Sequence, residues 1–280
     1  MTPSEPAIRN VSDTARWAAF FRAKESERRD ALFHDPFAAR LAGERGAMAA
    51  RSMGENDWAW AARTYVFDQI ISRCVADGAD AVVNLAAGMD ARPYRMDLPA
   101  ALRWVEVDLP EILTEKEQIL AGETPRCRLE RVKLDLADVE GRRALFGRIG
   151  SEVERALVVS EGLLIYLTRE QVTALARDLA APASFRDWAM DLVSPGLLEM
   201  LQKRFAAGAH AAAPLRFAPP EGPPFFTPYG WQPAEVHSLF KTAARKGRIG
   251  FPMRLLALLP ESEGRQGKRP WGAVCRLRRA

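Results

Sequence analysis

The chain contains little of what builds metal centres and disulfides. Its three cysteines are scattered over the 280 residues without a C-x-x-C pair. Only three histidines are present, at His34, His210 and His237, which is too few for a zinc site at the usual ligand spacings. The composition therefore predicts a protein with neither disulfides nor a metal site.

Long apolar runs and targeting signals are also missing. No run reaches about 18 apolar residues, so a membrane span is not expected. The N-terminus, MTPSEPAIRN, lacks the charged-then-apolar order of a signal peptide, which favours a cytoplasmic location. The net charge of +4 is spread along the chain and favours a solvated basic surface over a nucleic-acid patch. We therefore expect neither nucleic acid nor a membrane as a partner.

The sequence has no glycine-rich phosphate loop. The stretch DAVVNLAAGMDARPYRMD, residues 80–97, begins like a buried strand that runs into a tight turn. It carries one glycine, Gly88, and neither G-x-G-x-x-G nor a P-loop occurs. It also places Asp90 beside the turn, where an anionic pyrophosphate would be repelled. These features argue against a nicotinamide dinucleotide.

An alternation of strands and helices occupies the middle of the chain. Residues 12–75 have helical patterning only, which predicts a helical cap over residues 1–79. Apolar or alternating segments then predict strands at 81–86, 102–108, 129–135, 155–162 and 184–193. Helical segments separate them, so we expect an α/β fold with a doubly wound, mostly parallel, Rossmann-like sheet in a core of residues 80–194.

The C-terminal third is patterned differently. Residues 195–247, with a stretch rich in proline and aromatic residues at 213–230, are expected to form a lid or substrate insertion. Residues 248–280 contain RIGFPMRLLALLP and WGAVCRLRRA, joined by a turn-rich segment, and predict a hairpin with an antiparallel last strand. The count is seven strands in a single domain, 1–280.

Acidic residues follow several predicted strands, and ligands of such sheets bind at the carboxyl ends of the strands. Asp108 follows Gly88 by 20 residues, the distance at which an acid usually meets a ribose diol. Asp135 and Glu161 end the next two strands. S-adenosylmethionine has no phosphate and carries a sulfonium and an ammonium against one carboxylate, so a rim of acids suits it. The pattern favours this methyl donor over a dinucleotide.

Several of these segments resemble one known family. VVNLAAGMDARPYRMDLP, WVEVDLPEIL, LDL and SEGLLIYLT resemble the leucine carboxyl methyltransferase family. That family groups phosphatase carboxyl methyltransferases with bacterial O-methyltransferases that include enzymes for polyketide-type small molecules. The segment VSDTARWAAFFRAKESERRDALFHDPFAARLAG is similar to the bacterial branch, and FFTPYGW also fits. The resemblance covers nearly the whole chain and implies a class I S-adenosylmethionine-dependent O-methyltransferase.

The resemblance also implies which residues bind the methyl donor. Arg63 would pair with the methionine carboxylate, a natural use of the guanidinium fork, and Asp108 would hold the ribose hydroxyls. The other matching positions are Gly88 under the methionine moiety, Asp135 (side chain) and Leu136 (backbone) at the adenine, Glu161 near the methionine end, and Lys24 in the helical cap.

One position departs from the family pattern. Many relatives have G-A-G where this chain has Ala86, Ala87 and Gly88. Alanine adds only a methyl group, so we expect binding to survive if the backbone there is not at positive φ.

The expected reaction is direct displacement at the methyl carbon by an oxygen nucleophile. A carboxylate acceptor is already ionised and needs no base, whereas a phenol or an alcohol would be helped by one. The available bases are His34, Tyr166 and His237, and none is singled out as catalytic.

The acceptor is expected between the helical cap and the lid. Four aromatic residues could line that pocket or belong equally well to the core: Phe225, Phe226, Tyr229 and Trp231. They favour a small aromatic or polyketide-type acceptor. The alternatives are a protein or peptide C-terminal carboxyl group and a non-catalytic S-adenosylmethionine-binding role. A nucleic-acid base methyltransferase would show N/D-P-P-Y/F after the fourth strand, where this chain has SEGL.

Overall fold

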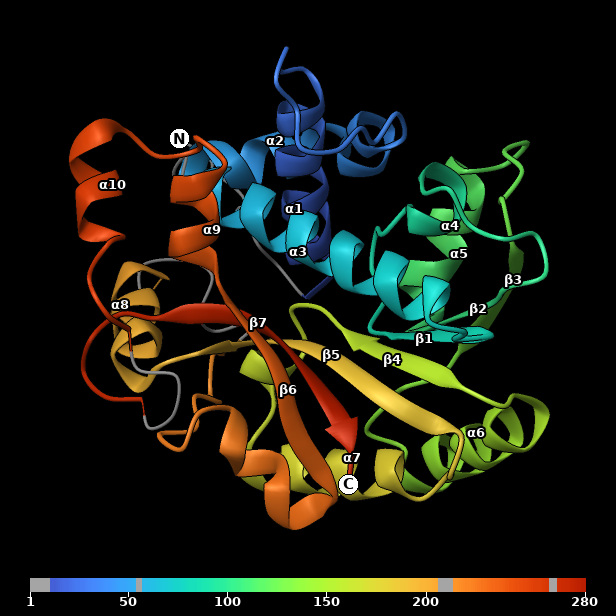
Figure 1. The fold of residues 1–280 in the computed structure, drawn as a ribbon. Helices are drawn as coiled ribbons and strands as arrows, with labels where there is room; N and C mark the ends of the chain where they lie inside the picture. The colour runs from blue at the N-terminus through green and yellow to red at the C-terminus, as the bar shows by residue number, and fades with distance from the viewer. Residues whose placement is uncertain (1–10, 54–56, 206–213, 262–265) are drawn as a thin grey trace, which may run out of the picture.

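The computed structural model describes residues 11–53, 57–205, 214–261 and 266–280. These residues contain a seven-stranded sheet of order β3-β2-β1-β4-β5-β7-β6 (Figure 1). Its strands are β1 (Ala81–Leu85), β2 (Arg103–Asp108), β3 (Arg128–Lys133), β4 (Ala156–Ser160), β5 (Phe185–Val193), β6 (Trp231–Ser238) and β7 (Gly272–Arg279). The neighbouring strands among β1–β5 are parallel, and β7 runs antiparallel to both β5 and β6. The doubly wound fold and the antiparallel last strand are therefore confirmed.

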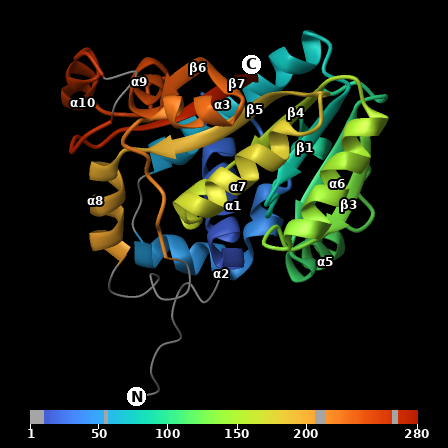
Figure 2. The ribbon, with the colours of Figure 1, turned by 90° about the horizontal axis from the view of Figure 1, so that it is seen from below.

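Helices cover both faces of the sheet (Figure 2). They are α1 (Val11–Ser26), α2 (Ala38–Met53), α3 (Asp57–Ala76), α4 (Arg92–Arg95), α5 (Pro110–Ile119), α6 (Val139–Glu152), α7 (Arg169–Ala180), α8 (Pro195–Phe205), α9 (Leu239–Arg245) and α10 (Phe251–Leu256), with 3-10 turns η1 (Leu164–Tyr166) and η2 (Pro223–Tyr229). Apolar residues of α3 pack on one face of β1, β2 and β4. Those of α6 and α7 pack on the other face. Burial on both sides explains why β1 and β4 are continuous apolar runs rather than alternating ones.

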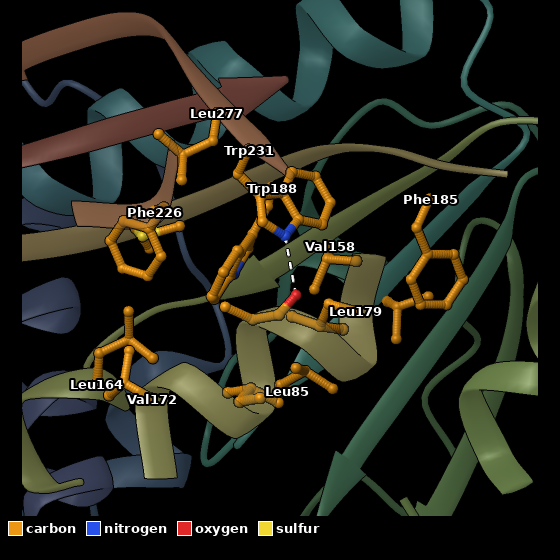
Figure 3. Packing of buried hydrophobic residues seen from close by; sticks show 14 of the residues in the cluster. Leu85, Val158, Leu164, Val172, Leu179, Phe185, Trp188, Phe226, Trp231 and Leu277 are labelled. Carbon is orange, nitrogen blue, oxygen red and sulfur yellow. Dashed lines mark hydrogen bonds between the residues drawn. The ribbon is translucent and has the colours of Figure 1, made fainter. Parts of the chain in front are cut away.

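A tryptophan pair anchors the core on the α7 side of the sheet (Figure 3). Trp188 of β5 and Trp231 of β6 are fully buried, with ring centroids 5.5 Å apart. The Trp188 indole donates to Ser160 Oγ over 2.9 Å, which satisfies its buried N–H. Phe225 and Phe226 pack into the same cluster and are almost fully buried. Three of the four aromatics expected at the acceptor pocket therefore serve the core, and the fourth, Tyr229, packs against them.

The C-terminal hairpin prediction is wrong. RIGFPMRLLALLP contains helix α10, and the strand beside β7 is β6, which lies inside the segment expected to be a lid. A short continuous apolar run does not distinguish a strand from a helix, and Pro252 at the first turn starts a helix. Pro233 argued against a strand at β6, because proline has no N–H to donate to a neighbouring strand. β6 is an edge strand, and its register shifts beside Pro233, so the missing N–H is accommodated.

Candidate functional site

The turn after β1 meets the end of β2. Because β1 and β2 are parallel neighbours, their carboxyl ends lie side by side. The Gly88 N–H donates to Asp108 Oδ2 over 2.7 Å, and the Leu109 N–H donates to Asp108 Oδ1 over 2.8 Å. Asp108 is buried, and this burial raises its pKa although the two backbone hydrogen bonds oppose the shift. A buried carboxylate thus stands at the predicted ribose position, fixed to the turn.

Arg63 of α3 lies between two carboxylates. Its Nε donates to Glu161 Oε1 over 3.0 Å and its Nη1 to Asp191 Oδ2 over 3.3 Å, while its guanidinium lies 4.5 Å from the Trp60 ring centroid. Burial disfavours the charged form, but Glu161 and Asp191 outweigh burial and raise the pKa of Arg63. Among the described residues, Arg63 Nη2 has no hydrogen-bond partner. It is therefore the atom that can receive a further carboxylate.

Arg92, which the sequence did not single out, connects the turn after β1 with the Glu161 carboxylate that contacts Arg63. Its Nη1 contacts Asp90 Oδ2 at 2.9 Å and Glu161 Oε2 at 2.8 Å, and its Nε donates to Asp68 Oδ1 over 2.7 Å. Glu161 is thereby held between Arg92 and Arg63. The side chain of Arg92 is only 3% exposed, so its contacts are made away from bulk water. The sequence signal that could have pointed to Arg92 was a charged residue in the segment after an apolar strand, because such a charge is rarely buried without a partner.

Asp90 does not belong to an acidic rim facing a ligand, which corrects the interpretation of this residue. It accepts hydrogen bonds from the Asn84 side chain over 2.9 Å and from the Arg92 N–H over 3.0 Å, besides its contact with the Arg92 guanidinium. Burial acts to raise its pKa, but Arg92 and the more distant Lys116 outweigh it and lower the pKa of Asp90. The charge of Asp90 is used to hold the turn.

The turn itself requires unusual backbone geometry. Gly88 has φ +47°, and a Cβ there would lie 2.9 Å from the Cβ of Ala15 in α1. Ala86 has φ +52°, in the region that favours glycine. The expectation that alanine is tolerated here depended on a backbone that is not at positive φ, and Ala86 does not meet that condition. Ala86 therefore carries backbone strain that a glycine would not.

We expect Ala86→Gly to raise the free energy of unfolding by up to about 1 kcal/mol. The left-handed conformation costs a non-glycine residue ~1–2 kcal/mol, and the added freedom of glycine in the unfolded chain offsets part of the gain. Urea titration followed by circular dichroism measures it. As a control, Ala87→Gly should destabilise the protein, because Ala87 is not at positive φ. A destabilising Ala86→Gly would contradict the strain.

The end of β3 completes the row of strand ends. The Leu134 N–H donates to the Asp108 carbonyl over 2.9 Å, which places the following residues beside Asp108. Asp135 is exposed, and its Oδ1 accepts the Ala137 N–H over 2.8 Å. The Leu136 carbonyl accepts from Arg142 Nη1 over 2.6 Å. Asp135 and Leu136 thus lie one strand beyond the ribose position.

Comparison with known proteins agrees with this arrangement. The model of the leucine carboxyl methyltransferase family matches residues 15–180. The chain belongs to this family. Similar proteins include inferred S-adenosyl-L-methionine-dependent methyltransferases of Streptomyces avermitilis, 31% identical over 95% of each chain, and of Streptomyces coelicolor, 32% identical over 95% of each chain. The crystal structure of an inferred methyltransferase from Thermobifida fusca superposes on this chain with a TM-score of 0.59 at 15% sequence identity. The superposition covers 98% of this chain and 96% of that one.

This leucine carboxyl methyltransferase family member is an S-adenosylmethionine-dependent methyltransferase, and the polar groups of α3 and of the end of β2 fit the cofactor. S-adenosylmethionine carries a carboxylate for a cation, ribose hydroxyls for a carboxylate and no phosphate for a glycine-rich loop. Arg63 Nη2 and Asp108 match the first two needs. The turn after β1, which carries one glycine, Gly88, instead of a glycine-rich loop, matches the third.

Lys24 and the two described histidines have the following surroundings. Lys24 Nζ is 3.8 Å from Asp57 Oδ2, and both side chains line a hollow between α1 and α3. His34 is exposed between α1 and α2. His237 Nε2 contacts Glu235 Oε2 at 2.8 Å within the edge strand β6. His210 lies outside the described residues. No contact seen among the described residues brings Lys24, His34 or His237 to Arg63 or Asp108.

Tyr166 is the weak catalytic candidate that does approach the site. It lies in η1, close enough to Arg63 and Asp191 to interact with both electrostatically. Burial raises the pKa of Tyr166 although the hydrogen bond with Thr14 and the charge of Arg63 oppose the shift. The phenol therefore stays protonated near neutral pH and can donate a hydrogen bond, but it is a poor base.

Proposed function

We propose that this methyltransferase transfers the methyl group to an oxygen of a small molecule, with a carboxylate as the favoured acceptor. The observation that supports it is that none of the described candidate bases is ready to act at the site. Of the described candidates, Tyr166 is held protonated, and neither His34 nor His237 contacts the cluster around Arg63. A carboxylate is ionised at neutral pH and needs no proton removed, whereas a phenol or alcohol does.

In the proposed mechanism the sulfonium supplies an activated methyl group. With S-adenosylmethionine bound, the acceptor oxygen would take the methyl group, the electron pair of the S–C bond would stay on sulfur, and the products would be a methyl ester and S-adenosylhomocysteine. Arg63 binds and orients the methionine carboxylate. Arg92 holds Glu161 in place beside it. Asp108 fixes the ribose end, so these residues contribute alignment rather than proton transfer.

The resemblance to the bacterial branch of the family supports an aromatic or polyketide-type acceptor. The four aromatic side chains of residues 225–231 do not support such an acceptor, because they belong to the core or pack against it. A second candidate, a protein or peptide C-terminal carboxyl group, has the same ionised chemistry.

A panel assay tests the proposal. Aromatic carboxylic acids, phenols, alcohols and a peptide with a free C-terminal leucine are incubated with labelled S-adenosylmethionine, and products are identified by mass spectrometry. Methyl esters of small acids are the expected products. Turnover of phenols alone would overturn the carboxylate preference, and ester formation only on the peptide would favour the second candidate. Binding of S-adenosylmethionine without any turnover would point to a non-catalytic role.

We expect Arg63→Ala to weaken S-adenosylmethionine binding by about tenfold or more, with a smaller loss for its decarboxylated analogue. A charge-assisted hydrogen bond contributes ~1.5–3 kcal/mol, and only the intact cofactor offers the carboxylate. Calorimetric titration of both ligands measures the ratio, in which general structural damage cancels. Arg73→Ala on the same helix, where Arg73 pairs with Glu235 at 2.5 Å, is the control and should change neither affinity. Equal losses for both ligands would refute the carboxylate role.

A further inference from the structure

Helix α10 and the residues after it expose an apolar surface. Six large apolar side chains of residues 251–259 are between 45% and 79% exposed: Phe251, Met253, Leu255, Leu256, Leu258 and Leu259. All six helical residues, 251–256, are exposed, although the helix also contacts α9. Figure 1 shows α10 at the edge of the molecule, beyond α9. Soluble monomers rarely leave contiguous apolar patches of this kind without a partner.

Basic residues accompany this surface. Arg245 and Lys246 are exposed at the end of α9, and Arg254 is exposed within α10. Arg248 is different, because its guanidinium is only 3% exposed and pairs with Glu25 and Asp30. The one acid of residues 245–261, Glu261, accepts a hydrogen bond from the Ser238 hydroxyl over 3.0 Å. Among the described residues of this segment, the charges without an acidic partner are therefore positive.

We propose that the segment 245–259 docks the protein on an anionic lipid bilayer. A bilayer surface can take up the exposed apolar side chains of this short helix, and its headgroups attract Arg254 and the cations beside the helix. A second copy of this chain fits less well, because a two-fold contact through α10 would bring the same cations together. The helix is also far too short to span a bilayer. No described helix can cross a membrane, so the expectation of no membrane partner is revised only for surface binding.

Vesicle co-sedimentation tests this docking. The full chain is mixed with vesicles of phosphatidylcholine alone and of phosphatidylcholine with phosphatidylglycerol. We expect binding to the anionic vesicles, weakened by high salt, and at least about tenfold weaker partitioning for Leu258→Asp/Leu259→Asp, since each leucine loses its apolar burial. Arg245→Gln/Arg254→Gln should lower binding to anionic vesicles but leave binding to neutral vesicles unchanged.

A matched control is Val139→Asp, an exposed apolar residue of α6, which Figure 1 shows on the opposite side of the molecule from α10; this variant should bind vesicles like the wild type. The thermal midpoint should be unchanged in all of these variants, because the replaced side chains are exposed. Equal binding of the wild type and the double aspartate variant would overturn the proposal. So would a wild-type dimer in light scattering that the double variant abolishes without any vesicle binding, since a second copy would then cover α10.

Discussion

Lys116→Met should lower the free energy of unfolding by about 3 kcal/mol or more, the range measured when one partner of a buried ion pair is removed. Lys116 and Glu106 are both fully buried, with Nζ 2.7 Å from Oε1, and Arg131 Nε donates to the other Glu106 oxygen over 3.0 Å. The methionine fills similar volume but leaves Glu106 with one cation instead of two. Urea denaturation monitored by circular dichroism measures the loss.

The matched control is Lys133→Met. Lys133 Nζ lies 2.8 Å from Glu117 Oε2, close to the 2.7 Å of the Lys116–Glu106 pair, but both side chains are more than a third exposed, at 39% and 37%. Water screens this pair, so the expected loss is below about 1 kcal/mol. Similar losses for both single variants would show that burial does not set the cost.

Asp108→Ala is expected to weaken S-adenosylmethionine binding by at least about tenfold. The carboxylate contacts assigned to the ribose are charge-assisted and contribute ~1.5–3 kcal/mol. The substitution also releases the Gly88 N–H, which Asp108 holds at 2.7 Å, so the turn under the methionine loses its tether. Calorimetric titration with S-adenosylmethionine gives the affinity, and unchanged affinity would remove the ribose assignment.

Two further measurements separate ribose recognition from turn support. Asp108→Asn keeps the side-chain shape and one acceptor for the Gly88 N–H, so it should preserve the thermal midpoint better than Asp108→Ala while still losing affinity. The wild type should bind adenosine more tightly than 2′,3′-dideoxyadenosine, and Asp108→Ala should abolish that difference. If the alanine variant kept the full preference for adenosine, Asp108 would act only on the turn.

The sheet and its ligand edge followed from local patterns. Buried apolar runs at β1 and β4 and alternating segments at β2 and β3 were separated by helical periodicity, and right-handed crossovers then leave few topologies. Gly88 and Asp108 could be paired from their spacing alone, because neighbouring parallel strands end at one edge. Arg63 and Glu161 are 98 residues apart and were brought together only by the resemblance to the family.

Other features had no local signal that decides them. Trp231 and Pro233 were expected in the lid, yet they belong to β6, which pairs with β7. Residues 251–256 were expected in a strand, yet they form helix α10. Asp191 lies in β5, two residues before its end, without any marked spacing, and it lies near Glu161 because β4 and β5 are neighbours. Pairing partners of this kind are chosen by competition among distant segments, which periodicity does not report.

The sequence by itself determined that this protein has a mostly parallel sheet, that Gly88 and Asp108 lie at the carboxyl ends of its strands, and that this edge lacks a glycine-rich phosphate loop. Tertiary structure decided what the charges at that edge do. Asp90, Arg92 and Glu161 come from different elements, and their burial makes pairing with one another more favourable than facing a ligand. It also decided that Ala86 sits at positive φ and that Gly88 lies under Ala15. The physical reason is that strand and helix formation depend on neighbours in sequence, whereas charge pairing and backbone strain depend on neighbours in space.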